Sequence, residues 1–439
     1  MGNKVRVAIG VICIIGIALL GWWTASSLGK VDYNALAKAE YEKGNYDKAI
    51  ELFTKAIGQN PSNADAYWNR GNTYAHEDSY FHHYNKLPGQ TYAEAGLEDE
   101  EKAFQNAVAD FKKAMELDPS YAPLAHFGLG NAYYLYYDSY EDRASRVIPE
   151  YEEALRGADQ IEARLGKEGV AMVYANLGRT YLAMSELEKA YESYKKALEI
   201  APIDTALEHL VPVCIELGKY KEAYDIASKY IKMSREAGSE ELDLALMPGA
   251  LAAYHLEKFD EALDYINEVI ETFPDSAYVA EAHRLRAMIY RAKGKEGKAK
   301  EDLEEAVKIC SEIISNPEVP ADIPGAYYER GLDYFDLEEY EKATEDFKYL
   351  VEHPEVADRE IAHENYYLEG HIALACTLSQ LGKNEEAKGV LQKTLKILKE
   401  DPELQGWNKY VRKDVEGLLG KVEKGETIPI PMMYEALGK

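Results

Sequence analysis

Small and bulky apolar residues recur at helical spacing along most of the chain, and residues 174–202 show the pattern in its clearest form. A period of 3.6 residues gives two faces: Tyr174, Leu177, Gly178 and Tyr181 on the first, and Ala190, Tyr194 and Ala197 on the second. The polar stretch between them suits a short turn. Pro202 cannot continue the second helix, because proline has no N–H to donate. The segment therefore predicts two antiparallel helices that approach closely at their small residues.

The same positions return about nine times between residues 31 and 404. Other copies are marked by Ala49 with Phe53, Ala107 with Phe111, Gly130 with Tyr133, Ala223 with Tyr230, Ala262 with Ile266, Ala299 with Leu303, Ala343 with Phe347, and Ala387 with Leu391. This series resembles the tetratricopeptide repeat, a helix-turn-helix unit of about 34 residues. The resemblance implies an all-α fold, a right-handed α-solenoid of about nine repeats that bury a continuous core by stacking.

Residues 1–30 have a different pattern. Lys4 and Arg6 precede an uncharged apolar run over residues 7–23, which ends in two tryptophans and is near the short limit for a membrane span. This favours a retained single-pass anchor, with the N-terminus inside and the repeat domain extracytoplasmic. The alternative is a signal peptide that is cleaved before a secreted protein.

The second repeat is interrupted by an insertion at residues 77–100, in the turn between its two helices. The insertion and its flank carry His76, His82 and His83, but no two of them have the spacing of metal ligands on one helix face. We therefore expect no metal site. The loop either packs on the neighbouring repeat or shapes one end of the binding groove, since loops in repeat arrays often carry function.

The C-terminal end is expected to close the array. Residues 405–424 suit a capping helix with a polar outer face. Residues 425–439 form an apolar tail that contains Pro429 and Pro431. This tail either packs as an extended strap on the last repeat or docks on a partner or a second copy of the chain.

Composition narrows the functional classes. The chain has 50 basic and 78 acidic residues and a net charge of −28, which repels nucleic acid. Its four cysteines are far apart and form neither a disulfide framework nor a zinc pattern. Phosphate-binding, hydrolase and metalloprotease motifs are absent from the sequence. We therefore expect a binding protein with no cofactor, and not an enzyme.

The resemblance also implies that the first helix of each repeat lines a concave, partner-binding face. Its face positions correspond here to Trp68, Asn72, Phe127, Asn131, Tyr134, Met172, Arg179, Leu182, Met247, Tyr254, Arg284, Arg291, Tyr328 and Phe335. Aromatic and arginine side chains are frequent energetic anchors of protein interfaces. Each of these residues has the alternative role of packing against a neighbouring repeat.

One branch of the family binds the C-terminal carboxylate of a peptide with paired Lys, Asn and Arg side chains. Lys38 and Asn69 lie near such positions, but Leu124 and Gly128 occupy places that would need basic residues. We expect no docking of that kind.

Together these features predict a membrane-tethered scaffold that binds protein or peptide partners, for assembly of a cell-envelope complex. Two alternatives stay open. One is a self-assembling subunit that forms oligomers or fibres through repeat or tail contacts. The other is an enzyme with its site in the histidine-bearing insertion.

Overall fold

The structure is a computed structural model of the chain. It describes residues 31–76, 98–137, 139–239, 242–315, 322–353, 366–400 and 411–430. These ranges consist of helices joined by turns and short extended segments, and they contain no strand. The predicted anchor at residues 1–30 and most of the insertion, residues 77–97, lie outside them.

The described helices follow one another as nine pairs and a final single helix. The pairs are α2 (Tyr33–Tyr41) with α3 (Tyr46–Gln59), α4 (Ala64–Tyr74) with α6 (Glu98–Leu117), α7 (Ala122–Tyr136) with α9 (Ile148–Arg156), α10 (Ala158–Ala183) with α11 (Leu187–Ile200), α12 (Asp204–Glu216) with α13 (Tyr220–Ala237), α14 (Leu242–His255) with α15 (Phe259–Thr272), α16 (Val279–Ala292) with α17 (Glu296–Ser315), α18 (Asp322–Asp336) with α19 (Tyr340–Glu352), and α21 (Tyr366–Gln380) with α22 (Asn384–Glu400). The final helix is α24 (Val411–Glu423). The expected all-α repeat array is confirmed.

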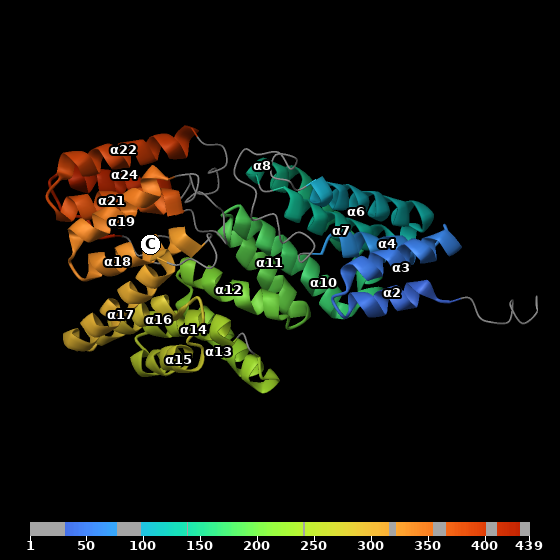
Figure 1. The fold of residues 1–439 in the computed structure, drawn as a ribbon, viewed down its shortest axis with the longest axis horizontal. Coiled ribbons are helices and arrows are strands. Elements are labelled where there is room, and N and C mark those ends of the chain that lie inside the picture. The colour runs from blue at the N-terminus through green and yellow to red at the C-terminus, as the bar shows by residue number, and fades with distance from the viewer. Residues whose placement is uncertain are drawn as a thin grey trace, which may run out of the picture.

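Each pair packs mainly on the pairs before and after it, as expected for a solenoid. Figure 1 shows the row of helices running from α2 at the right to α14–α17 at the lower left, from where it turns upward to α24. The first helices of successive pairs contact one another along one side, as in α4 with α7 and α16 with α18. The sequence predicts the partner-binding groove on this side of the array.

An aromatic ring from the second helix fills the space beside a small residue of the first. Tyr194 of α11 is fully buried against Gly178 of α10, and Phe347 of α19 is fully buried against Gly331 of α18. A Cβ atom at either glycine would lie 2.9 Å or less from the ring, closer than real Cβ atoms approach other heavy atoms. The glycine is therefore what allows the two helices to pack at this separation.

Buried arginine–aspartate pairs join the two helices in several repeats. Arg330 of α18 donates to both carboxylate oxygens of Asp346 on α19, over 2.7 and 2.9 Å. Arg70 and Asp110 form the same contact between α4 and α6. The arginine directly precedes the small residue of the first helix, and the aspartate directly precedes the bulky residue of the second.

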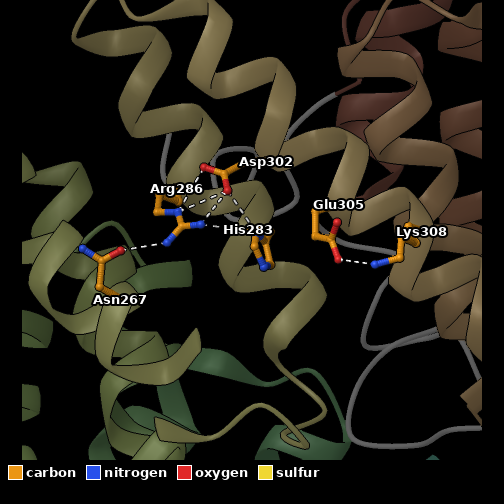
Figure 2. Close-up of polar contacts among 6 residues, drawn as sticks. All are labelled: Asn267, His283, Arg286, Asp302, Glu305 and Lys308. Carbon is orange, nitrogen blue, oxygen red and sulfur yellow. Dashed lines mark hydrogen bonds and ion pairs between the residues drawn. The ribbon is translucent and has the colours of Figure 1, made fainter. Parts of the chain in front are cut away.

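The equivalent pair between α16 and α17 belongs to a larger cluster. Figure 2 shows Asp302 accepting from both Arg286 and His283, while Arg286 also donates to Asn267 of α15. Burial alone would raise the pKa of Asp302, but the hydrogen bonds from His283 and Arg286 outweigh it and lower the pKa. In Asp346, which has a single arginine partner, burial dominates and raises the pKa.

The third and fourth repeats depart from the regular pattern. A three-residue helix, α8 (Tyr140–Asp142), and a π-helical turn, η4 (Arg143–Val147), precede the short α9. Helix α10 contains a kink at Gly166, which has φ 72° and ψ −175°. A side chain would be strained at this positive φ, so glycine permits the break. Residues 158–165 therefore form an additional helical segment before the fourth repeat.

The C-terminal end is closed by α24 and by residues 426–430. Helix α24 packs on α22. The chain then turns at Gly425, and Ile428 is fully buried against the last repeat. The backbone N–H of Ile428 donates to Ser379 of α21, and its carbonyl accepts from Gln380. The described part of the predicted tail is thus an extended strap on α21.

In the described ranges, no helix is both long enough and apolar enough to cross a bilayer. The predicted anchor cannot be compared with this finding, because residues 1–30 are not among those ranges.

Candidate protein-binding groove

A pocket of about 460 Å³ lies at the N-terminal end of the first-helix side of the array. It is lined by Lys38, Tyr41, Glu42, Phe53, Asp65, Trp68, Asn69, Asn72, Tyr121, Leu124, Arg164 and Leu165. These residues come from the first three repeats and from the additional segment before the fourth, so the pocket exists only because these elements stack. Aromatic and aliphatic walls with a few polar groups are typical of binding pockets.

The polar side of the pocket is organised around Asp65. Its carboxylate accepts from Lys38 at 2.7 Å, from Asn34 at 2.7 Å and from the Tyr121 hydroxyl at 3.1 Å. Burial acts to raise the pKa of Asp65, but these partners outweigh it and lower the pKa. Asp65 is therefore held ionised, and it fixes Lys38 and Tyr121 at the pocket wall.

The apolar side of the pocket is built around Trp68. The indole N–H donates to the backbone carbonyl of Leu124 at 3.1 Å, which links the second repeat to the third. The ring of Tyr121 lies 6.5 Å from the indole, centroid to centroid. Trp68 is only half-buried, so part of its apolar surface faces the pocket. A bulky apolar side chain of a partner could be buried against it.

The additional segment before Gly166 completes the pocket on one side. Arg164 places its guanidinium 4.3 Å from the centroid of the Tyr121 ring and donates to the Ser120 hydroxyl at 2.8 Å. Leu165 lines the pocket next to it. Because these residues precede the regular repeat, the pocket is closed by an element that a plain repeat would not have.

The residues that the sequence placed in the groove fall into several groups. Trp68 and Asn72 line the pocket, and the resemblance assigned both of them correctly to the first-helix side. Met172 of α10 lies on the surface with 48% of its area exposed. The other predicted contact residues do not line this pocket.

Four of the predicted contact residues lie in the interior. Phe127, Leu182, Met247 and Tyr328 have exposed fractions of 4–7%. Tyr328, for example, packs against Phe347 of its own repeat and Tyr366 of the next. The first helix of a pair faces its neighbours as well as the groove, and these four side chains point toward the neighbours. A partner cannot reach them in this structure, which corrects their expected role as contacts.

Asn131 and Tyr134 join the third repeat to the fourth. The amide oxygen of Asn131 accepts from Tyr151 and from Asn176 of α10, each at 2.8 Å. The guanidinium of Arg179 lies over the Tyr134 ring at 4.5 Å. These polar and aromatic contacts hold adjacent repeats together.

Arg284 and Arg291 of α16 pair with acidic residues of α18, so neither arginine is an unpaired cation available to a partner. Arg284 contacts Glu329 at 2.9 Å and lies 3.9 Å from Asp333. Arg291 lies 3.7 Å from a carboxylate oxygen of Asp336 and donates to the Asp336 backbone carbonyl. Reversing these arginine charges would therefore disrupt contacts between repeats, which makes it a poor test of partner binding.

Tyr254 and Phe335 are half-buried near the turns of their repeats. The ring of Tyr254 packs near Phe259, and the ring of Phe335 packs edge-on against Tyr340, with centroids 5.9 and 5.3 Å apart. Each contact joins the end of a first helix to the start of the second helix. Both rings keep partly exposed surface that a partner could use.

The histidines of the insertion give no evidence of a metal site. His76 stacks on Tyr46 with centroids 4.4 Å apart, while His82 and His83 lie outside the described residues. No group of three potential metal ligands occurs in the described ranges. Cys214, Cys310 and Cys376 are buried apolar fillers, and burial raises the pKa of the Cys214 thiol to about 12.

Sequence reasoning missed Arg164, Tyr121 and Asp65 as pocket residues. The sequence contains one indication of this part of the pocket, the glycine in Arg164–Lys167 (RLGK), which interrupts a helical stretch. Nothing in the sequence indicates that this interruption folds back onto Tyr121.

Four segments of the chain match known repeat families. Residues 37–76 match the family described as TPR repeat, and residues 171–204, 249–276 and 280–312 match families described as Tetratricopeptide repeat. The chain contains tetratricopeptide repeats. The second match begins at residue 171, after the kink, so residues 158–166 lie outside the matched repeat.

The chain is also similar to several known proteins. DnaJ homolog subfamily C member 7 of Homo sapiens is 21% identical over 378 residues, which cover 75% of this chain and 68% of that protein. TPR repeat-containing protein MJ1428 of Methanocaldococcus jannaschii is 22% identical over 378 residues, covering 76% and 59%. The solved structure of the apo form of RapI covers 90% of this chain and 99% of its own, with 13% identity and a TM-score of 0.53. At this identity the structural match shows the fold alone.

Proposed function

We propose that this tetratricopeptide-repeat protein is a scaffold that binds protein partners on its first-helix side, with the pocket around Trp68 as the anchor point. The pocket is the observation that carries the proposal. Three repeats and the additional segment contribute to it, it holds half-buried aromatic surface, and Asp65 already holds Lys38 and Tyr121 in place. A preorganised pocket of this kind loses little conformational freedom when a partner binds.

An extended segment of a partner suits this site better than a large flat surface. Asn69 and Asn72 stand one helical turn apart on α4, beside Trp68. Asn69 uses its NH₂ group to reach the backbone of Asp65, which leaves its amide oxygen as an acceptor. Side-chain amides beside an apolar pocket can bind the backbone of an extended peptide while one of its side chains is buried.

The proposal includes a membrane tether at the N-terminus. It is supported by the uncharged run of residues 7–23 with its terminal tryptophans and by the basic residues that precede it. Tethering would concentrate the repeats near partners in the same membrane, for assembly of an envelope complex. Alkaline extraction of membranes tests this tether: the intact chain should stay with the membrane fraction, and a chain without residues 1–30 should be released.

Quantitative affinity purification from native cells tests the binding role. The intact chain is compared with Trp68→Ala, which removes the apolar anchor, and with Asn72→Trp, which fills the pocket without removing a packed ring. We expect both variants to lose the same specific proteins. A matched control is Leu36→Ala, which changes an exposed apolar residue that neither lines the pocket nor belongs to the predicted contact positions. Equal recovery of all proteins by the four chains would contradict the proposal.

A further inference from the structure

Arg164 is an exposed cation at the edge of the pocket, and no carboxylate of the described residues pairs with it. Its guanidinium lies over Tyr121, and it donates to the hydroxyl and the carbonyl of Ser120 at 2.8 and 3.3 Å. It forms no ion pair with any described residue. By contrast, Arg70 of the neighbouring repeat is paired with Asp110.

The nearest acidic residues do not neutralise Arg164 by contact. The pKa of Asp118 is lowered, first by hydrogen bonds from Ser120 and to a smaller extent by the charge of Arg164. Asp65 is occupied by Lys38, Asn34 and Tyr121. An arginine has five N–H donors, and Arg164 uses two of them on Ser120, so donors remain for a ligand.

The other charged groups of the pocket are Lys38 and Glu42. Lys38 is held by Asp65, and its charge is compensated there. Glu42, at the C-terminal end of α2, is exposed and forms no ion pair among the described residues. The pocket therefore offers a free cation on α10 and a free anion on α2, with the apolar walls between them.

We propose that Arg164 makes this pocket selective for a peptide segment in which a carboxylate lies next to a bulky apolar side chain. The apolar side chain packs on the part of the Trp68 ring that faces the pocket, and the carboxylate accepts hydrogen bonds from the free donors of Arg164. This inference rests on the proposed function, because it assigns the chemistry of the same pocket. It differs from a paired-base carboxylate site, since a single arginine on the additional segment makes the contact.

Because the chain as a whole is strongly acidic, a carboxylate ligand is repelled at long range and attracted only near Arg164. Added salt should screen both effects, so the affinity for the carboxylate peptide, and with it the selectivity over the neutral match, should change little with ionic strength. Glu42 opposes the ligand's charge, and its removal should strengthen binding.

The test uses the intact chain in detergent and short fluorescein-labelled peptides read by fluorescence polarisation. The first pair of peptides has no free C-terminal carboxylate and contains Asp-Phe or Asn-Phe within a glycine-serine sequence. The second pair ends in Phe, either as a free acid or as an amide. We expect the carboxylate-bearing member of at least one pair to bind about five-fold more tightly than its neutral match. Selectivity in the first pair identifies an acidic side chain as the source, and selectivity in the second identifies a C-terminus.

Arg164→Gln should abolish this selectivity, and Glu42→Gln should increase it. Arg412→Gln, at an exposed arginine of α24, is the matched control and should leave it unchanged. Suppose that the peptides bind, that Asn72→Trp weakens their binding, and that carboxylate and neutral peptides bind equally well. The inference about Arg164 is then overturned and the proposed function stands. If no peptide binds, or if Asn72→Trp has no effect on binding, the pocket itself is contradicted.

Discussion

The ring of Phe111 lies against Gly128 of the next repeat so closely that a Cβ atom built on this glycine would be 2.4 Å from the ring's Cε1 atom. The same ring also contacts Gly71 of its own repeat. Phe111 is fully buried and thus wedged between α4 and α7. The contact between the second and third repeats, which also supports the pocket, depends on the absence of a side chain at residue 128.

Replacing Gly128 with alanine should therefore destabilise the N-terminal repeats by about 1–3 kcal/mol, because the added methyl group overpacks the interface with Phe111. Gly389→Ala is the matched control. It lies in α22, nothing is within 4 Å of its built Cβ, and the gain in helix propensity should stabilise by up to about 1 kcal/mol. Urea denaturation measures both changes. A stabilised Gly128→Ala variant would show that α4 and α7 can separate freely.

Tyr151 and Tyr194 occupy equivalent positions in adjacent repeats, but only the first has a hydrogen-bond partner for its hydroxyl. Tyr151 donates to Asn131 at 2.8 Å, whereas the buried Tyr194 hydroxyl has no hydrogen-bond partner among the described residues. Tyr151→Phe should cost about 1 kcal/mol, while Tyr194→Phe should be neutral or stabilising, because it removes an unsatisfied buried polar group. Thermal unfolding of the two variants checks this, and equal losses would contradict the assignment.

The ion pair of Arg330 and Asp346 should contribute little net stability, although losing one partner alone should be costly. Removing either charge alone leaves the other buried and should cost about 3–5 kcal/mol, whereas the double variant Arg330→Met/Asp346→Leu should cost far less. A double-mutant cycle by chemical denaturation measures the difference. Additive losses would indicate that the two charges act independently.

His371 should make the last repeat sensitive to acid. It is fully buried in α21, and burial lowers the pKa of its imidazole from 6.5 to about 4. Between these values the unfolded chain binds a proton that the folded chain does not, so stability should fall as the pH drops from 6.5 toward 4. The full effect is about 3 kcal/mol, at about 1.4 kcal/mol for each pKa unit.

The comparison with His371→Gln isolates this effect, since burial also raises the pKa of other carboxyl groups, such as that of Asp333. The stability difference between the two chains should change with pH only below about 6.5. Hydrogen exchange in α21 reports it locally, because repeat arrays can unfold in parts. A difference that is independent of pH would show that His371 is protonated equally in both states.

The fold could be predicted from the sequence because its decisive contacts are local. Gly178 and Tyr194 are close in sequence and recur as a pattern, and the pattern alone determines which helix faces meet. The third repeat could be recognised from Gly130 and Tyr133, although its second helix, α9, is short. A period of this kind specifies neighbouring helices without any knowledge of distant contacts.

The site could be predicted only in part, because its contacts join distant positions. A face position such as Tyr328 can point to the groove or to the next repeat, and the spacing is the same in both cases. Arg284 finds Glu329, 45 residues away, and in a chain with so many acidic residues the sequence cannot select that partner. Arg164 lies in a segment outside the repeat pattern, where the period carries no information.

The role of the pocket as a docking site is tested most directly by site-specific photocrosslinking in native cells. A photoreactive residue is placed at Asn72 in the pocket, or at Lys396 on an exposed part of α22 as the control. We predict discrete protein adducts from residue 72 that disappear when Trp68→Ala is added, and none of these adducts from residue 396. The same adducts from both positions, or adducts from residue 72 that persist without the tryptophan, would contradict the pocket as the docking site.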